Sequence, residues 1–180
     1  QPPLFKLKKG SKDIYLQDED SLNDFLLENS INELITDESF SKNKITKDDL
    51  LKSIAHFRRH KVYLDNLERS GMDIRILNII IPILGELEDL NISKLEKASI
   101  KEIKRLKTEK PLDDYICRKD SSGSLTFSVK NQGRIKDTII TSKSLESQLL
   151  QKAVKEYSIS IDKLNFPLIL ESKSGEKYEF

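Results

Sequence analysis

The sequence contains a single cysteine, Cys117, and no long run of apolar residues. One thiol excludes an internal disulfide framework and fits a protein of the reducing cytoplasm. The most apolar stretch, residues 79–84, is far shorter than the ~20 residues of a membrane-spanning helix, so we expect no membrane partner. A glycine-rich loop ending in Lys-Ser/Thr, which would cradle phosphates, is also missing.

A catalytic constellation is missing as well. His56 and His60 lie one helical turn apart and could face one metal ion. However, no Glu-x-x-His context and no cysteine pair accompany them, and Arg58 and Arg59 would oppose a cation. Two histidines on a helix face are the simpler interpretation. We therefore predict no metal site, no catalytic residue and no cofactor within this chain.

Other side chains that could carry chemistry are better explained as structure. Cys117 lies in a strand-like pattern without an obvious partner base, which favours a packed thiol over a nucleophile. Paired acids favour helix caps and turns over acid–base catalysis. These pairs are Asp18/Asp20, Asp48/Asp49 and Asp113/Asp114.

Charge is distributed unevenly although the net charge is only +1. Acidic residues accumulate between positions 13 and 39, and this range contains no lysine or arginine. Basic residues cluster at positions 58–61 and recur along 94–110. Such patches could meet nucleic acid, or they could be the solvated faces of an ordinary charged protein. The sequence alone leaves both interpretations open.

The 180 residues suffice for one medium domain or two small ones, and 37% of them are hydrophobic. Because the chain begins with Gln1 and its first residues look like the end of a strand, we expect a fragment of a longer protein. The apolar pattern predicts an α+β fold. Its predicted parts are an N-terminal hairpin, three to four helices, an antiparallel β-meander, and a C-terminal helix and hairpin.

Strand-like runs define the β parts of this prediction. Residues 4–8 and 13–17 form the first hairpin, joined by a turn in which Gly10 supplies a positive φ. The meander comprises residues 112–119, 124–130 and 134–140, where apolar and polar side chains alternate. Residues 168–171 and 177–180 form the last hairpin.

Helices follow from 3.6-residue periodicity and capping residues. Asp18 or Ser21 starts a helix to about residue 29, followed by a short strand at 31–36 and a loop at 37–44. Thr46 caps a long helix that ends at Gly71, and Asp73 caps a buried helix that Pro82 ends.

Two further helices complete the expectation. One runs from Ser93 or Ser99 to residue 107, and the other from Ser142 or Ser144 to about residue 157. The positions expected to face inward on the first of them are Leu95, Ile100, Ile103 and Leu106.

The first seventeen residues carry a resemblance to a known family. Gln1-Pro2-Pro3-Leu4-Phe5-Lys6, a basic turn, Ile14-Tyr15 and the acidic run Asp18-Glu19-Asp20 resemble the B subunit of bacterial DNA gyrase, where the chain leaves the last strand of the TOPRIM domain. The family usually has tyrosine at the position of Phe5. A long segment follows here, as in the gyrase B proteins of many Gram-negative bacteria, which carry a large insert at this place.

This resemblance implies a domain assignment and a role. Residues 1–17 would end the TOPRIM strand and hairpin, and residues 18–180 would form the insert, helical at 18–110 with the meander and a helix at 111–180. The family's catalytic Glu-Gly-Asp and Asp-x-Asp motifs precede this point and Arg-Tyr-Lys-Gly-Leu-Gly-Glu follows the insert; none occurs here. The chain would therefore be an inactive piece of an ATP-dependent topoisomerase.

The resemblance also implies partners. The full-length enzyme would need Mg²⁺ and ATP, and its partners would be DNA and the gyrase A protein in an A2B2 complex. The insert would support DNA binding and communication between the two kinds of protein chain during negative supercoiling. Candidate phosphate contacts are the cations of the first hairpin and of the long helix: Lys6, Lys8, Lys9, Lys12, Arg58, Arg59 and Lys61.

Two other hypotheses remain open. The chain could be an independent protein-interaction module that docks a basic partner through its acidic face at 13–39. It could also be a free-standing nucleic-acid-binding protein, which the near-neutral net charge disfavours.

Overall fold

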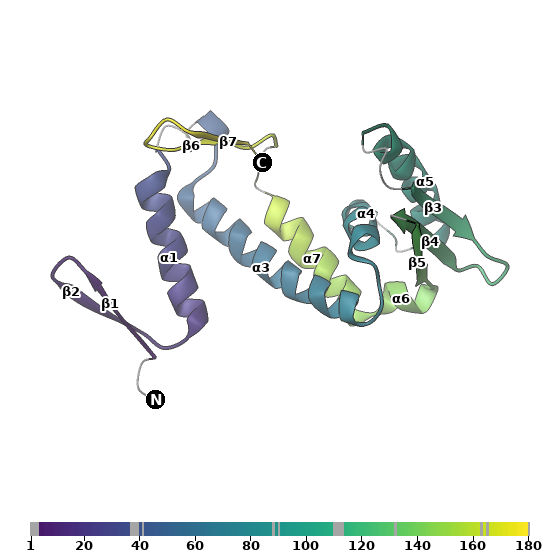
Figure 1. Cartoon of the computed structure of the whole chain (residues 1–180), viewed down its shortest axis with the longest axis horizontal. Helices are drawn as coiled ribbons and strands as arrows, with labels where there is room; N and C mark the ends of the chain where they lie inside the picture. The colour runs from purple at the N-terminus through teal and green to yellow at the C-terminus, as the bar shows by residue number, and fades with distance from the viewer. Residues whose placement is uncertain are drawn as a thin grey trace. The chain divides into compact units, whose positions relative to one another are not determined.

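A computed structural model describes residues 4–36, 40, 42–87, 89, 91–109, 114–131, 133–162, 164 and 166–179 (Figure 1). It is a mixed α/β structure with small antiparallel sheets, as predicted. The chain divides into two compact units, Gln1–Ser53 with Lys163–Phe180, and Ile54–Asp162. The assignment of residues 1–17 and 18–180 to different parts of a larger enzyme stays a prediction.

The N-terminal hairpin pairs β1 (Phe5–Lys9) with β2 (Lys12–Leu16). Lys9 pairs with Lys12, which leaves Gly10 and Ser11 as a two-residue turn. Gly10 has φ 62°, the left-handed conformation that such turns require, so the predicted hairpin and its turn are confirmed. Pro2 and Pro3 lie outside the described residues.

Helix α1 (Glu19–Leu34) begins at an Asp18 cap, whose carboxylate accepts a hydrogen bond from the Ser21 N–H at 2.7 Å. It continues to Leu34, so the prediction that it ends near residue 29 and is followed by a strand at 31–36 is wrong. The buried side chain of Ile31 lies on the last turns of the helix, and Ile35 contributes only an isolated bridge to Ser172. Burial of Ile31 in the helix therefore outweighs the preference of the β-branched residues at 31–36 for a strand.

A short C-terminal hairpin completes the first unit, with β6 (Ile169–Glu171) paired to β7 (Lys177–Glu179) as predicted. Hydrogen bonds of 3.1 Å from Thr36 N–H to the Glu171 carbonyl and of 2.6 Å from Asn43 Nδ2 to the Ile169 carbonyl tie it to the segment after α1. Phe40, Lys42 and Asn43 are helical rather than part of a loop, while residues 37–39 and 41 lie outside the described residues.

Helix α3 (Lys47–Arg69) is the long helix of the prediction. Thr46 Oγ1 accepts from the Asp49 N–H at 3.0 Å while Asp49 Oδ2 accepts from the Thr46 N–H at 3.2 Å, a reciprocal cap. The helix ends at Ser70 and Gly71, where Gly71 has φ 104°. Both ends are as predicted.

Helix α4 (Ile74–Glu86) begins at the predicted Asp73 cap but runs through Pro82, so the prediction that Pro82 ends it is wrong. Proline costs the helix one hydrogen bond to the carbonyl of Asn78. The helix continues because Leu84, beyond the proline, is 3% exposed and packs in the core with Ile80 and Ile81. Burial of these side chains offsets the lost hydrogen bond.

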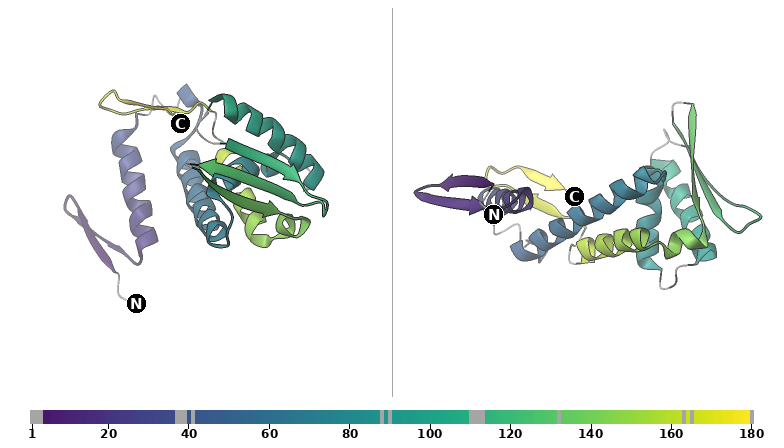
Figure 2. Two further views of the ribbon diagram at one scale, coloured as in Figure 1. Left: turned by 45° about the vertical axis from the view of Figure 1, so that its right-hand side comes forward. Right: turned by 90° about the horizontal axis from the view of Figure 1, so that it is seen from below.

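Helix α5 (Ile92–Glu109) packs along the meander of β3 (Asp114–Lys119), β4 (Leu125–Asn131) and β5 (Arg134–Ile140) (Figure 2). The antiparallel order β3–β4–β5 and the buried face at Leu125, Phe127 and Val129 confirm the predicted meander. Ile100 is 37% exposed and Ser99 is buried instead, so the inward position predicted for Ile100 is wrong.

The predicted helix at 142–157 is two helices, α6 (Ser142–Glu146) and α7 (Gln148–Asp162). A Thr141 cap precedes α6, and the chain leaves helical geometry at Ser147. The break lets Leu145 and Leu150 both point into the core of the second unit. None of the described helices is both long and apolar enough to cross a membrane.

Candidate functional site

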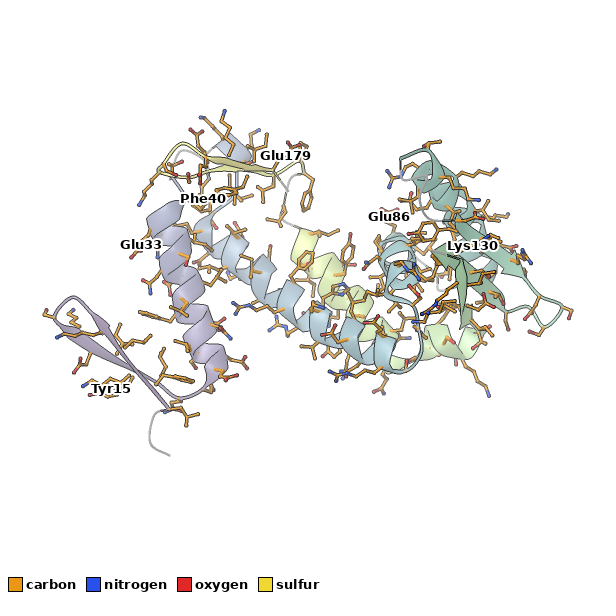
Figure 3. The ribbon with its side chains drawn as sticks, in the orientation of Figure 1. Tyr15, Glu33, Phe40, Glu86, Lys130 and Glu179 are labelled. Atoms are coloured by element: carbon orange, nitrogen blue, oxygen red, sulfur yellow. The ribbon has the colours of Figure 1, made fainter. Side chains whose placement is uncertain are left out.

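The hairpin places its lysines on two faces. Lys6 and Lys8 share one face with Asp13 and Tyr15, because alternate residues of paired strands point the same way. Tyr15 is labelled on this hairpin in Figure 3. The Lys6 ammonium lies 2.8 Å from the Asp13 carboxylate and 5.5 Å from the centre of the Tyr15 ring. The Asp13 hydrogen bond, with a smaller contribution from Tyr15, raises the Lys6 pKa. Lys8 and Lys12 are exposed. The Lys9 side chain lies outside the described part.

The cations of α3 are positioned differently. Arg58 is exposed, Arg59 Nε lies 3.0 Å from Glu156 Oε2 on α7, and Lys61 Nζ lies 2.9 Å from Asp65 Oδ1 one turn along its own helix. Arg59 and Lys61 therefore already hold an acid. The hairpin belongs to the first compact unit, whereas these three cations belong to the second.

Glu156 is the centre of a polar cluster between α3 and α7. Its Oε2 accepts from His56 Nδ1 at 2.7 Å as well as from Arg59, and the carboxylate is only 17% exposed. Burial by itself would raise the pKa of Glu156, but the hydrogen bonds from His56 and Arg59 outweigh it and hold the pKa below its usual range. The cluster can anchor α7 to α3.

His56 and His60 do not converge on one point. His56 turns to Glu156, whereas His60 Nδ1 donates to the backbone carbonyl of Ala153 at 2.8 Å. Across the described ranges, no group of three His, Cys, Asp or Glu side chains is arranged to hold a metal ion. His60 is 5% exposed, so it is a core residue and not a histidine on the helix surface. The periodicity of the sequence did not reveal this burial.

The remaining candidates behave as structural residues. Burial, with a smaller contribution from Glu96, raises the pKa of the half-buried Cys117 thiol to about 11, which suppresses its thiolate. Among the acid pairs, Asp18 is a helix cap and Asp49 completes the reciprocal cap with Thr46. Asp114 lies 3.1 Å from the Lys107 ammonium. Asp113 lies outside the described residues.

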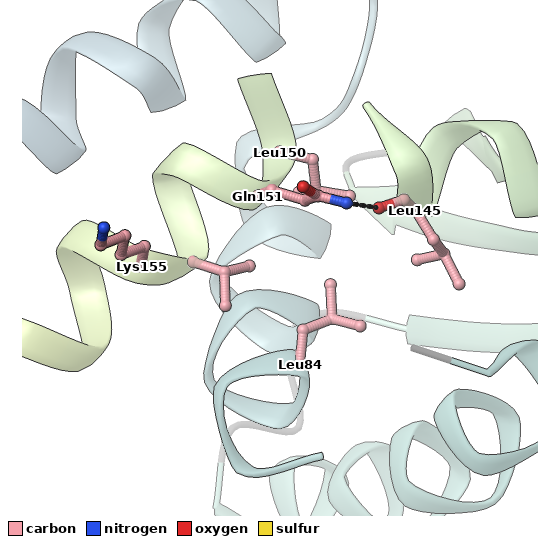
Figure 4. A pocket seen from close by; sticks show the side chains of 6 residues that line it. Leu84, Leu145, Leu150, Gln151 and Lys155 are labelled. Carbon is pink, nitrogen blue, oxygen red and sulfur yellow. Dashed lines mark hydrogen bonds between the residues drawn. The ribbon is translucent and has the colours of Figure 1, made fainter. Parts of the chain in front are cut away.

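Described residues of the second unit line at least two cavities. The first, of about 170 Å³, is formed by Leu84, Leu145, Leu150 and Val154, with Gln151 and Lys155 at its polar side (Figure 4). Gln151 Nε2 on α7 donates a hydrogen bond of 3.3 Å to the Leu145 carbonyl on α6. This hydrogen bond spans the break between the two helices. The second, of about 270 Å³, lies between α3, α4 and α7, beside His60 and Tyr157.

Comparison with known proteins gives one kind of relative. No protein-family model matches the chain. The chain is 33% identical over 106 residues to the DNA gyrase B protein of Helicobacter pylori, which covers 59% of the chain. It is 27% identical over 173 residues to that of Campylobacter jejuni, covering 91% of the chain, and 29% identical over 155 residues to that of Rickettsia conorii, covering 84%.

The matched segments are a small part of those proteins. They span 13% of the Helicobacter pylori protein, 20% of the Campylobacter jejuni protein and 18% of the Rickettsia conorii protein. The similarity thus supports a segment of a gyrase B protein.

Proposed function

We propose that this chain is the end of the TOPRIM strand and the accessory insert of a DNA gyrase B protein, without catalytic residues of its own. The similarity to three gyrase B proteins, reaching 91% of the chain in one of them, carries this proposal. Its role is to support DNA binding and communication between the gyrase chains while the rest of the enzyme cleaves DNA and hydrolyses ATP. Mg²⁺, ATP and the gyrase A protein belong to that larger assembly.

The proposal makes a direct claim about the flanking gene. The sequence preceding Gln1 should encode an Asp-x-Asp cluster and Glu-Gly-Asp, the carboxylates that two-metal phosphodiester chemistry needs. The sequence following Phe180 should encode Arg-Tyr-Lys-Gly-Leu-Gly. Reading the gene on both sides tests this, and a frame that lacks these motifs refutes the assignment.

For DNA contact we favour the hairpin over α3. Lys8 and Lys12 are exposed, whereas Arg59 is held by the largely buried Glu156 and would have to release it to reach a phosphate. Lys61 is held less firmly, since its partner Asp65 is on the surface and exposed ion pairs contribute only about 0–1 kcal/mol. Lys6 holds Asp13 and so steadies the hairpin.

The salt dependence of duplex binding by the isolated chain tests this surface. Non-specific affinity should be about 10⁻⁴ to 10⁻⁶ M, and each phosphate contact contributes roughly −0.9 to the slope of log affinity against log salt. Reversing two hairpin charges, Lys8→Glu with Lys12→Glu, should therefore flatten the slope by roughly 1.8. Fluorescence anisotropy of a labelled duplex at several salt concentrations gives the slope.

A matched variant separates local contact from net charge. Lys143 and Lys152 are exposed on α6 and α7, so Lys143→Glu with Lys152→Glu changes the net charge equally. We expect this variant to keep the slope of the parent chain. Equal flattening by both variants refutes the hairpin contact, and no binding even at low salt favours a purely protein-interacting role through the acidic face.

A further inference from the structure

The cavity between α3, α4 and α7 has a composition that is unlike a simple packing defect. Phe57, His60 and Leu64 line it from α3, Ile81 and Pro82 from α4, and Tyr157 from α7. Its volume of about 270 Å³ is slightly smaller than the roughly 300–1,000 Å³ of pockets that hold drug-sized molecules. An occupant of one or two fused rings therefore fits its size.

His60 presents a hydrogen-bond acceptor to this cavity. Its Nδ1 must carry the proton, because the Ala153 carbonyl at 2.8 Å can only accept. In the neutral ring, Nε2 then holds a free lone pair, and no described residue bonds it. His60 is only 5% exposed. Among the described side chains, Ser99 Oγ is the one fully enclosed polar atom without a hydrogen-bond partner, so the unpaired Nε2 of His60 is not fully enclosed. Nε2 is therefore accessible, and His60 is one of the residues that line the cavity.

The charge state of His60 is consistent with an acceptor. Burial lowers its pKa, and the Ala153 hydrogen bond and the charge of Glu156 offset this only in part. The imidazole is therefore neutral at pH 7, with its lone pair available. The other ionisable groups at the cavity are Lys61, whose ammonium is held by Asp65, and Tyr157, whose pKa is raised by burial and, less strongly, by Glu86.

Helix α4 contributes Asn78 and Pro82 to the lining. Pro82 has no N–H to donate to the carbonyl of Asn78 one turn earlier, and both residues line the cavity. The Asn78 carbonyl therefore lacks its usual i+4 donor within the helix.

Aromatic rings form the apolar walls. The ring centres of His60 and Tyr157 are 5.4 Å apart, and Phe57 lies edge-on to both at 6.0 and 6.4 Å. Phe57 is nevertheless 45% exposed, a large apolar surface left to solvent at the cavity mouth. Offset or edge-to-face contacts with these rings would stabilise a planar aromatic occupant, while the Lys61 charge disfavours a cation.

We propose that this cavity binds a small neutral heteroaromatic molecule of indole size, whose ring N–H donates to Nε2 of His60. The site is independent of the DNA-binding role proposed above. No relative or sequence motif assigns it. The Ala153 carbonyl positions the imidazole, and Phe57 and Tyr157 hold the plane of the ligand.

Indole itself is the probe, because the chain contains no tryptophan and indole fluorescence can be excited separately from tyrosine. For a ligand this small we expect a dissociation constant of about 0.1–1 mM. 1-Methylindole has the same rings but no N–H donor, so it should bind at least about fivefold more weakly. Titrations followed by fluorescence and by the ring nitrogen shifts of His60 measure both ligands.

Variants place the binding at this cavity. His60→Asn keeps a donor for the Ala153 carbonyl but removes Nε2, and should reduce the preference for indole over 1-methylindole to about onefold. Phe57→Ala removes a half-exposed wall and should weaken both ligands without unfolding the chain. Val62→Ala, at an exposed position of α3 away from the cavity, is the matched control and should bind as the parent does.

The proposal is overturned by any of three results. Indole and 1-methylindole could bind the parent chain equally, indole could show no saturable binding, or binding could survive both His60→Asn and Phe57→Ala. Circular dichroism confirms that each variant is folded. If His60→Asn does not fold, the two ligands on the parent chain and on Phe57→Ala decide the matter.

Discussion

Asp73 stabilises the second unit through several contacts at once, and replacing it with alanine tests how they combine. Its Oδ1 accepts from the Arg75 N–H at 2.9 Å as the cap of α4, and from Arg75 Nε at 3.0 Å. Its Oδ2 accepts from Arg75 Nη2 at 2.9 Å and lies 3.7 Å from the Lys136 ammonium. The Asp73 side chain is 4% exposed, whereas that of Arg75 is 30% exposed.

These contacts set the expected loss for Asp73→Ala. Losing the cap costs about 1 kcal/mol, and losing a charged hydrogen bond costs about 1.5–3 kcal/mol. Because Arg75 is partly exposed, water replaces some of its lost partner, so we expect a total of about 2–3 kcal/mol. At about 3–4 °C per kcal/mol for a unit of this size, the midpoint of thermal unfolding should fall by about 6–12 °C.

The loss should also depend on pH. The Arg75 hydrogen bond, together with the nearby cations, holds the pKa of Asp73 below its ordinary value of 3.8. The folded state therefore favours the carboxylate, and the stabilisation is fully present above about pH 4. It disappears as the pH falls through the lowered pKa, so the difference between parent and Asp73→Ala should shrink in that window.

Two further variants make the prediction specific. Asp73→Asn keeps an oxygen for the cap but removes the charge, so its loss should lie between those of the parent and Asp73→Ala. Asp18→Ala removes an exposed cap of α1 and should cost only about 0.5–1 kcal/mol. Denaturant unfolding gives these free energies. A loss below about 1 kcal/mol for Asp73→Ala, or one that stays constant from pH 7 to acid, refutes the reasoning.

Three other predictions follow from single positions. Gly71→Ala should destabilise the chain by about 1–2 kcal/mol through backbone strain alone, since φ is 104° and no atom lies within 4 Å of an added Cβ; a neutral effect in denaturant unfolding contradicts this. Phe127→Ala should cost about 3–5 kcal/mol because the ring is fully buried, against about 0.5 kcal/mol for Phe166→Ala at an exposed ring, both measured calorimetrically. Iodoacetamide should alkylate Cys117 at least about tenfold faster in the unfolded chain than in the folded one at pH 8, and similar rates would be inconsistent with a thiol pKa of about 11.

Local chemistry explains which parts of the fold were predictable. The Thr46 and Asp73 caps and the turn at Gly10 depend on one residue and its near neighbours, so the sequence predicts them correctly. For the first helix the sequence offers Asp18 or Ser21, and Asp18 is the cap. The meander follows from alternation at Leu125 and its neighbours, which one covered face produces.

The errors arise where distant contacts override local preference. Pro82 breaks an isolated helix, but the burial of Leu84 keeps α4 continuous. Nothing near Ser147 in sequence signals the break between α6 and α7. His60 lies at a position like that of a surface residue, and only the approach of Ala153 from α7, 93 positions later, explains its burial. The cavity beside it, built from three helices, was invisible to sequence analysis for the same reason.

Ser99 shows that this sequence retains room for improvement. Ser99 belongs to α5, and its hydroxyl is enclosed in the core without a hydrogen-bond partner. It is the sole such atom among the described side chains. An enclosed unpaired hydroxyl costs about 1–3 kcal/mol compared with a paired one, and alanine is the better helix former. Selection keeps proteins above a stability threshold and no further. This position is therefore where a protein engineer could gain stability without touching the hairpin, the polar cluster or the cavity.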